Sequence, residues 1–465
     1  FNFLCLMTSF FNNFSKFKKR TALIENKIKV SFDEIIKNSK ILHEKIDDNS
    51  VSLLIADNNI NFVKGYVSFL EKNKNISILA DESFDNEFFY KIVTAYQPNY
   101  IFLPLRLKKF FKLYKAIYKI SDYVILKTSY VKHKNLNFKN FLLLSTSGTT
   151  QNPKFVRLSR YNLKSNIKNI INYLKIRKNH TTMTTMPLGY SYGLSILNSH
   201  LAAGARVVIS KKTIFEKKFW DILKLEKINS FGGVPEFYEF LQKLNFKKRL
   251  EKTLKYITQA GGKLSLESLK YYGNVCREKK IKFYVMYGQT EASPRMTYLE
   301  WKYFFKSFGS VGKPLKGCSL VLKNKNGKKI NKSGETGEIF FYGKNVCLGY
   351  ANSLKDLNKG DKNKGELNTG DLGKYDKYKN LFILGRKDKF VKIFGKRCNL
   401  IDLENYLKEK KLLAKCNYKK PYLEINTTSL MKEKIIKKYS SEFLKLNANF
   451  ILVKKKTFKT LKDYK

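Results

Sequence analysis

The chain has 465 residues, of which 43% are hydrophobic and 28% charged. This composition excludes a disordered or fibrous protein, and the length allows two or three domains around a large core. Lys and Arg number 91 against 38 Asp and Glu, which gives a formal net charge of +53. The excess is mostly lysine spread along the chain, so we interpret it as compositional bias rather than as a specific nucleic-acid site.

The six cysteines are scattered and form no C-x-x-C pair. This usage predicts free thiols in a reducing cytoplasm rather than a disulfide framework. The four histidines show no metal-site spacing, and no apolar stretch reaches the roughly 18 residues that a transmembrane helix needs. Residues 1–7 are apolar but short and lack a basic leader, so we do not interpret them as a signal peptide. Either Met7 is the natural start or the N-terminus is incomplete.

Short apolar runs alternate with amphipathic segments through the first part of the chain. Residues 51–55, 76–79 and 100–103 are predicted strands, and residues 62–70 are a predicted helix. Strands that alternate with helices predict parallel βαβ units. A further apolar run, at 141–144, predicts a buried strand directly before a loop rich in hydroxyl residues.

That loop spans residues 145–154 and is built to hold phosphate. Gly148 allows close backbone approach, and Lys154 adds a positive charge. The hydroxyls that can donate to phosphate oxygens are those of Ser145, Thr146, Ser147, Thr149 and Thr150. The spacing is not that of a Walker loop, and an ordinary turn is the alternative interpretation of the segment by itself.

The alternation of strand and helix continues beyond the loop, with a strand at 205–209, a helix at 214–225 and a strand at 228–234. From about Gly309 the pattern changes. Strands at 319–323, 337–342 and 381–384 are separated by turns rich in Gly, Asn and Lys, which predicts a β-rich subdomain. The chain is therefore expected to be α/β, with a large N-terminal domain of βαβ subdomains plus a β-rich subdomain.

Three further motifs follow the loop in order: Tyr287-Gly288-Gln289-Thr290-Glu291, then Thr369-Gly370-Asp371, then residues 385–395. With the loop, this order resembles the adenylate-forming (AMP-binding) superfamily, which includes acyl-CoA synthetases, adenylation domains and luciferases. The resemblance runs from about residue 20 to the end. It implies an N-terminal AMP-binding domain at 1–385 and a small, mobile C-terminal α+β lid domain at 386–465, which is abbreviated relative to the family.

The resemblance also implies roles for residues that contact ATP. Lys154 would partly neutralise the negative charge of the leaving phosphates. The alternative interpretation is that Lys154 is an ordinary surface lysine. Tyr287 would stack on adenine, for which its aromatic face is suited, although core packing explains it equally well. Thr290 would bind the α-phosphate, and Glu291 would bind Mg2+, which prefers carboxylate and phosphate oxygens.

The later motifs carry the remaining implied roles. Asp371 and Arg386 would bind the ribose; a turn-capping aspartate and a surface ion pair are the alternatives. Asp388 matches the hinge position of the family, and Gly395 lies where the pantetheine arm passes. Tyr190 and the Gly261-Gly262 pair match segments that line the acyl pocket, and core packing and a simple turn are the alternatives.

The sequence departs from the family pattern at three places. Gln151 replaces a glycine of the phosphate loop, and Arg160 replaces a common histidine. At the C-terminus the family has a lysine that bridges carboxylate and α-phosphate, where Leu461 falls here without a gap. A one-residue shift puts Lys462 there, and Lys459 is a weaker candidate.

The leading hypothesis is an ATP-dependent ligase that forms an acyl-adenylate and transfers the acyl group to a thiol. Its implied cofactors are ATP, Mg2+, and CoA or a phosphopantetheine carrier, and its partners are a carboxylic acid and an acyl or peptidyl carrier protein. A nucleotide-binding homologue that has lost synthetase activity is the second hypothesis, motivated by Gln151 and Leu461. Nucleic-acid binding through the basic surface is a third, which rests on charge alone.

Overall fold

The computed structural model describes residues 11, 14–72, 74–131, 133, 136–145, 153–387, 390–393, 396–419, 422–428, 432–444, 449 and 451–455. The chain divides into two compact units. The first comprises Phe1–Leu320, Phe340–Leu367 and Asp376–Leu381, and the second comprises Val321–Ile339, Asn368–Tyr375 and Phe382–Lys465.

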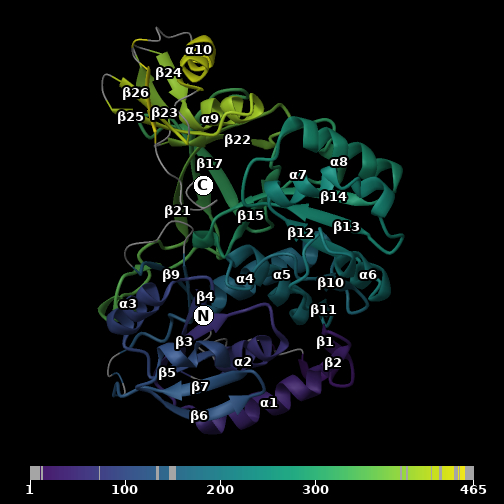
Figure 1. The fold of residues 1–465 in the computed structure, drawn as a ribbon, viewed down its shortest axis with the longest axis vertical. Coiled ribbons are helices and arrows are strands. Elements are labelled where there is room, and N and C mark those ends of the chain that lie inside the picture. The colour runs from purple at the N-terminus through teal and green to yellow at the C-terminus, as the bar shows by residue number, and fades with distance from the viewer. Residues whose placement is uncertain are drawn as a thin grey trace. The chain divides into compact units, whose positions relative to one another are not determined.

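One sheet of the first unit is mainly parallel (Figure 1). Its inner strands run parallel, and β15, β16 and β2 add antiparallel edges. In spatial order, its described strands are β16 (Lys313–Pro314), β15 (Arg295–Tyr298), β14 (Lys282–Gly288), β13 (Tyr256–Gln259), β12 (Ser230–Gly233), β10 (Thr181–Met183), β11 (Arg206–Val208), β1 (Thr21–Glu25) and β2 (Ile28–Ser31).

A second sheet of this unit has a parallel centre, β8-β4-β3-β5, with antiparallel strands on both sides. In spatial order, its described strands are β20 (Gly349–Ala351), β9 (Phe155–Leu158), β8 (Leu142–Ser145), β4 (Asn75–Asp81), β3 (Ser50–Ala56), β5 (Tyr100–Pro104), β7 (Tyr123–Lys127) and β6 (Lys115–Ile120). The predicted strands at 51–55, 76–79, 100–103 and 141–144 are thereby confirmed as β3, β4, β5 and β8.

Helices cover both faces of these two sheets. The described helices of the unit are α1 (Phe32–Lys45), α2 (Ile60–Glu71), α3 (Asn86–Tyr96), α4 (Arg160–Leu174), α5 (Ser191–Ala202), α6 (Lys217–Leu225), α7 (Pro235–Lys243) and α8 (Leu266–Glu278). One core cluster joins residues of α1, α2, α4 and α5, and these helices lie between the sheets. Helix α3 covers the outer face of the second sheet, whereas α6, α7 and α8 cover that of the first.

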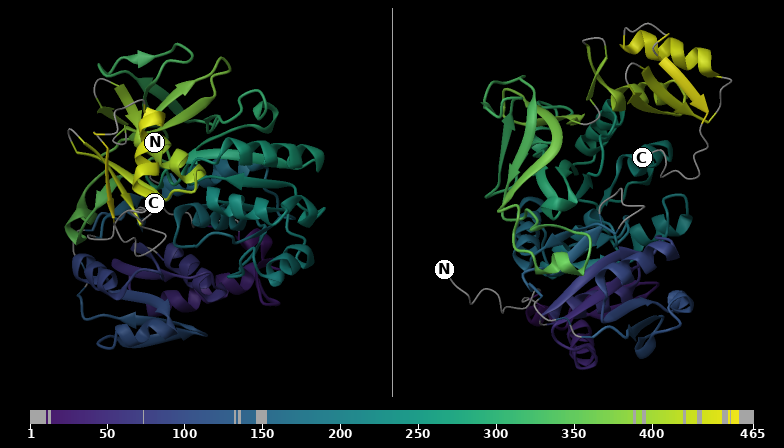
Figure 2. Two further views of the ribbon diagram at one scale, coloured as in Figure 1. Left: turned by 45° about the horizontal axis from the view of Figure 1, so that its top comes forward. Right: turned by 90° about the vertical axis from the view of Figure 1, so that its left-hand side faces the viewer.

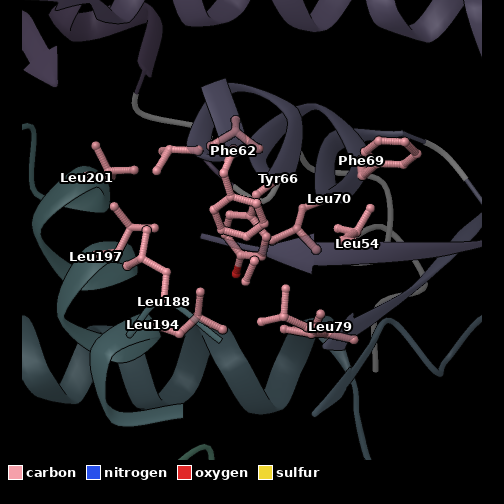
Figure 3. Packing of buried hydrophobic residues seen from close by; sticks show 14 of the residues in the cluster. Leu54, Phe62, Tyr66, Phe69, Leu70, Leu79, Leu188, Leu194, Leu197 and Leu201 are labelled. Atoms are coloured by element: carbon pink, nitrogen blue, oxygen red, sulfur yellow. The ribbon is translucent and has the colours of Figure 1, made fainter. Parts of the chain in front are cut away.

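The layer between the sheets is apolar and densely filled. Figure 3 shows Leu194, Leu197 and Leu201 of α5 facing Phe62 and Tyr66 of α2. All of these side chains are buried. Tyr66 Oη accepts a hydrogen bond of 3.0 Å from Asn198, so even the polar groups of this layer hold α2 and α5 together.

Local sequence signals explain where several helices begin and end. Ser159 caps α4, and its hydroxyl accepts from the backbone N–H of Asn162 in a capping box. Arg160, the departure from the family pattern, lies over the Phe141 ring at 4.3 Å and donates to the carbonyl of Leu70 at 2.9 Å. The predicted helix at 214–225 starts later, at Lys217, because Ile214 packs into the core from the turn before the helix.

The second unit contains most of the β-rich region and the C-terminal segment (Figure 2). The described elements that lie wholly or partly in this unit occur in three small sheets and two helices. They are β18 (Lys329–Ile330), β17 (Ser319–Lys323), β19 (Gly337–Tyr342), β21 (Glu366–Tyr375) and β22 (Leu381–Arg386); β23 (Phe390–Ile393) and β24 (Lys396–Asn399); β25 (Ala414–Lys419), β26 (Tyr422–Thr427) and β27 (Ile451–Lys455); and α9 (Leu400–Glu409) and α10 (Glu433–Leu444).

The C-terminal segment has a hydrophobic core of its own. Leu403 and Leu407 of α9 pack with Leu423 of β26 and Ile436 of α10. This arrangement of strands and helices agrees with the expected α+β lid, and the predicted domain boundary between residues 385 and 386 stays a prediction. Among the described residues, no helix is both long and apolar enough to cross a membrane.

The buried His200 of α5 predicts an acid-sensitive contribution to stability. Its Nδ1 lies 2.8 Å from the carbonyl of Ile196, so Nδ1 donates, and Nε2 accepts from Tyr256 or Ser230. Burial lowers the pKa of His200 to about 4, below the roughly 6.5 of an unfolded histidine. The unfolded chain therefore binds this proton first, and stability should fall as the pH drops from about 6.5 to about 4.

The free energy of unfolding, measured with urea from pH 7 to pH 4, should lose this part of its pH dependence in the variant His200→Gln. The lost part is on the order of 3 kcal/mol in total. The partly exposed His133 provides a control variant, His133→Gln, which makes the same substitution outside the core. An unaltered slope in the His200 variant would contradict the prediction.

Candidate active site

The motif at 287–291 lies where β14 ends and the chain reverses into β15. A Cβ at Gly288 would lie 1.7 Å from the carbonyl oxygen of Pro294, so only glycine fits this reversal. Tyr287 is half-buried against a small cluster that includes Met296 and Phe341. Thr290 and Glu291 follow in a short 3-10 helix, Thr290–Ala292.

Thr290 contacts the start of helix α5. Its Oγ1 lies 3.0 Å from the Oγ of Ser191, the first residue of that helix. The positive end of the α5 dipole therefore lies beside the Thr290 hydroxyl, and such a position favours negative charge. This environment suits the predicted contact between Thr290 and a phosphate.

Lys154 and Glu291 are joined through one tyrosine. The Nζ of Lys154 lies 3.9 Å from the centre of the Tyr350 ring, and the Tyr350 hydroxyl donates a hydrogen bond of 2.7 Å to Glu291 Oε1. Tyr350 was not predicted as a site residue, because no sequence motif contains it. It reaches this place through the pairing of β20 with β9, which sets Ala351 opposite Phe155.

The three predicted pocket residues also come together. Gly261 has φ of +84°, and a Cβ there would lie 2.9 Å from the Tyr190 hydroxyl. A Cβ at Gly262 would lie 2.9 Å from Pro235 Cγ. Burial raises the pKa of Tyr190, which keeps its hydroxyl neutral. Both glycines thus leave room that a side chain would fill, and the acyl-binding role stays a prediction.

In the second unit the two residues predicted to bind ribose are neighbours. Arg386 Nη1 lies 3.6 Å from Asp371 Oδ1 and donates to the carbonyl of Thr369 at 2.8 Å. The sequence pattern predicts a turn here, but Asp371 lies within β21, where Gly370 has φ of +68°. Asp371 is 6% exposed and is held within the sheet, whereas Arg386 is half-exposed. The sheet therefore fixes the position of the carboxylate beside the arginine.

Several predicted residues lie outside the described part of the chain. They are Thr146, Ser147, Gly148, Thr149 and Thr150 of the phosphate loop, Asp388 of the hinge, Gly395 of the pantetheine passage, and Lys462 of the tail. Their roles stay predictions.

The described residues contain no group of three or more His, Cys, Asp or Glu side chains that could hold a metal by themselves. Mg2+ in nucleotide sites commonly takes one or two carboxylates and completes its shell with phosphate oxygens and water. Glu291 follows Thr290 in the chain and bonds to Tyr350, whose ring Lys154 contacts, and its carboxylate fits that requirement. The donor set therefore suits Mg2+ that arrives with a nucleotide.

The fold matches solved structures of adenylate-forming ligases. The o-succinylbenzoate coenzyme A synthetase (MenE) of Bacillus subtilis in complex with AMP aligns with a TM-score of 0.75 at 20% identity, over 98% of this chain and 95% of that chain. The likeness shows a mixed α/β fold with a small C-terminal domain, which confirms the predicted fold class.

Sequence comparison then identifies the family. Residues 124–351 match the model of the AMP-binding enzyme family. The oxalate–CoA ligase of Arabidopsis thaliana is 29% identical over 272 residues, which are 57% of this chain and 52% of that protein. The D-alanine–D-alanyl carrier protein ligase of Bacillus licheniformis is 27% identical over 279 residues, 57% and 54% respectively. The family model and these relatives support placing the chain in the adenylate-forming, AMP-binding superfamily. The chain spans about half the length of these relatives.

The Tyr350 contact predicts an effect on metal-dependent nucleotide binding. Tyr350→Phe removes the hydrogen bond that orients Glu291 but keeps the ring under Lys154. Loss of such a supporting hydrogen bond should raise the Mg2+ concentration needed for ATP binding about tenfold. Calorimetry of ATP binding at increasing Mg2+ measures this, and Tyr350→Leu, which also removes the ring, should weaken binding further. The exposed Tyr161 gives the control, Tyr161→Phe, and equal behaviour of the Tyr350 and Tyr161 variants would refute the role.

The Asp371 carboxylate should contribute to nucleotide affinity directly. Asp371→Ala should weaken ATP binding by roughly 1.5–3 kcal/mol, the scale of a hydrogen bond to a charged group. Asp376 provides a matched control, because its carboxylate accepts from the N–H groups of Tyr378 and Asn380 and so caps a turn. Asp376→Ala should lower stability and leave ATP affinity unchanged. An ATP dissociation constant within twofold of the parent for Asp371→Ala would exclude the ribose role.

Proposed function

We propose that this protein is an AMP-forming acid–thiol ligase. In the first half-reaction a carboxylate oxygen attacks the α-phosphorus of ATP, and pyrophosphate leaves to give an acyl-adenylate. In the second, a thiol attacks the acyl carbonyl, loses its proton, and AMP leaves. Pyrophosphate exchange is the direct assay of the first half-reaction.

The observation that carries this proposal is the arrangement around Glu291. A carboxylate suited to Mg2+, a hydroxyl at the positive end of a helix and a lysine held over an aromatic ring occur within one small region of the first unit. Activation of a carboxylate requires these groups, because two anions must approach each other while the charge on the triphosphate is neutralised.

The chain's own residues would divide this work. Lys154 would draw charge from the leaving phosphates, and Thr290 would donate to the α-phosphate. Glu291 would hold Mg2+, which supplies charge neutralisation at the phosphates when bound. Asp371 and Arg386 would bind the ribose, and Lys462 is the proposed tail lysine.

The acceptor thiol is either CoA or the phosphopantetheine of a carrier protein. Relatives of both kinds occur, since the matches include an oxalate–CoA ligase and a D-alanyl carrier protein ligase. The net charge of +53 would favour encounter with either acceptor, because both carry negative charge. Thioester formation with free CoA or with a purified acyl carrier protein distinguishes the two. A cytoplasmic location is part of this proposal.

Glu291→Gln should abolish most exchange while the fold stays intact, because a neutral amide holds Mg2+ poorly. Pyrophosphate exchange should fall by about 10²-fold at limiting Mg2+. The exposed Glu267 on α8 provides the control variant Glu267→Gln, which should exchange normally. Full exchange by the Glu291 variant would rule out the metal role, and ATP binding without exchange for any acid would favour the homologue that has lost synthetase activity.

A further inference from the structure

Two arginines of the first unit are almost completely buried, and they differ in how their charge is satisfied. Arg157 is 0% exposed and Arg295 is 2% exposed. A buried guanidinium is costly unless acceptors or a counterion compensate it. Arg157 donates to four backbone carbonyls and one side-chain amide, those of Leu348, Tyr350, Lys359, Gly360 and Asn140. Arg157 is thus a structural cross-link.

Arg295 has no comparable set of acceptors. Its Nε and Nη2 donate to the Ser195 hydroxyl at 3.2 and 3.1 Å, and Nη1 donates to the Tyr173 hydroxyl at 2.7 Å. Its remaining contacts are the Met286 sulfur at 2.8 Å and the face of the Tyr192 ring at 4.6 Å. Within the described part of the chain, none of its partners is a carboxylate or a carbonyl.

The neighbours of Arg295 orient its charge but do not neutralise it. The Ser195 hydroxyl donates to the carbonyl of Tyr192 at 2.7 Å, which leaves its lone pairs to accept from Arg295. The surrounding cluster contains Tyr192, Tyr256 and Tyr284, which burial keeps neutral by raising the pKa of each. The result is a pre-oriented cation among neutral hydroxyls and aromatic rings.

Helix α5 sets the distance between Arg295 and the reacting groups. Ser191 contacts Thr290, and Ser195, four residues later, contacts Arg295. Residues four apart lie on one face of a helix, separated by roughly 6 Å along its axis. The serine that contacts Arg295 therefore lies about one helical turn along α5 from the serine that contacts Thr290, whose hydroxyl would hold the α-phosphate.

We infer that the acid this protein activates carries a second carboxylate, which pairs with Arg295. The substrate would be a short dicarboxylic acid, because one helical turn separates the two anchoring groups. Such a substrate supplies the counterion that the described residues do not provide, and an arginine binds a carboxylate through two parallel hydrogen bonds. A monocarboxylic acid would leave the buried cation unpaired beside an alkyl chain, so the site would discriminate against it. This inference rests on the proposed function.

Pyrophosphate exchange with matched pairs of acids tests it: malonate against propionate, succinate against butyrate, and glutarate against valerate. Each pair has the same chain length and differs by one carboxylate. For the preferred length, kcat/KM for the diacid should exceed that for the monoacid by roughly 100-fold, the scale of a hydrogen-bonded charge pair. A parent enzyme that uses butyrate, propionate and valerate as well as their diacids would overturn the inference.

The variant Arg295→Met replaces the cation with an apolar side chain of similar length. It should lose roughly 100-fold in kcat/KM for the preferred diacid and reverse the preference towards the monoacid. Arg295→Lys keeps the charge and should retain part of the preference, because it cannot form the planar pair. Arg206 lies beyond the C-terminal end of α5 and donates to Thr181 Oγ1, so Arg206→Met is the control. Its ratio of kcat/KM for the diacid to that for the monoacid should be unchanged.

A binding experiment without ATP separates failure of the inference from failure of the proposed function. Succinate, but not butyrate, should raise the thermal unfolding temperature of the parent protein, and Arg295→Met should abolish this shift. Exchange with monoacids only would overturn the dicarboxylate assignment and leave the ligase function standing. A succinate shift that depends on Arg295, without exchange for any acid, would support the site and refute the ligase function. If succinate causes no shift and no acid supports exchange, both the dicarboxylate inference and the ligase function are refuted.

Discussion

The organisation of the first unit depends on one helix, α5, which is buried along nearly its whole length between two sheets. Every residue from Ser191 to Leu201 is buried. Its leucines pack against α2, as Figure 3 shows, while Tyr192 and Ile196 pack into the cluster beneath the first sheet. A helix that is enclosed on all sides cannot shift without disturbing both cores. The residues at its start are therefore held at fixed positions.

The fixed start of α5 also fixes the positions of groups that would take part in the reaction. Tyr190, Ser191 and Ser195 lie at the beginning of α5, and they contact Gly261, Thr290 and Arg295 respectively. The polar residues of the helix need partners because they are buried. Asn198 and His200 find theirs in the core, whereas Ser191 and Ser195 bond to Thr290 and Arg295. One helix thus positions the predicted phosphate ligand, the predicted pocket and the buried arginine relative to one another.

The charged groups that would contact the phosphates and the metal are held by contacts with a tyrosine and not by α5. Lys154 and Glu291 carry opposite charges, but the tyrosine ring and hydroxyl of Tyr350 lie between them. A direct ion pair would neutralise both charges, whereas contacts with a neutral tyrosine orient them and leave the charges available to a nucleotide and its metal. The same reasoning applies to Arg295, whose hydroxyl partners orient the guanidinium and leave its charge uncompensated.

The amino-acid sequence by itself was enough to predict most strands, the order of the motifs and the resemblance to a family. Buried parallel strands are short continuous apolar runs, so residues 51–55, 76–79 and 100–103 were recognisable without a structure. The motif residues were recognisable because phosphate and metal ligands need particular side chains at close spacing along the chain. The start of α6 was placed too early, since an apolar residue such as Ile214 packs into a core equally well from a turn.

Only the tertiary structure decided the positions and contacts of Tyr350 and Arg295. Tyr350 meets Glu291 across 59 positions of sequence, through the pairing of β20 with β9. Arg295 meets Ser195 across 100 positions, through the packing of β15 near α5. In a lysine-rich chain an arginine in a strand carries no visible signal of its own. What distinguishes Arg295 is its burial with no carboxylate partner among the described residues. Such burial arises from the packed fold and leaves no signal in the local sequence pattern.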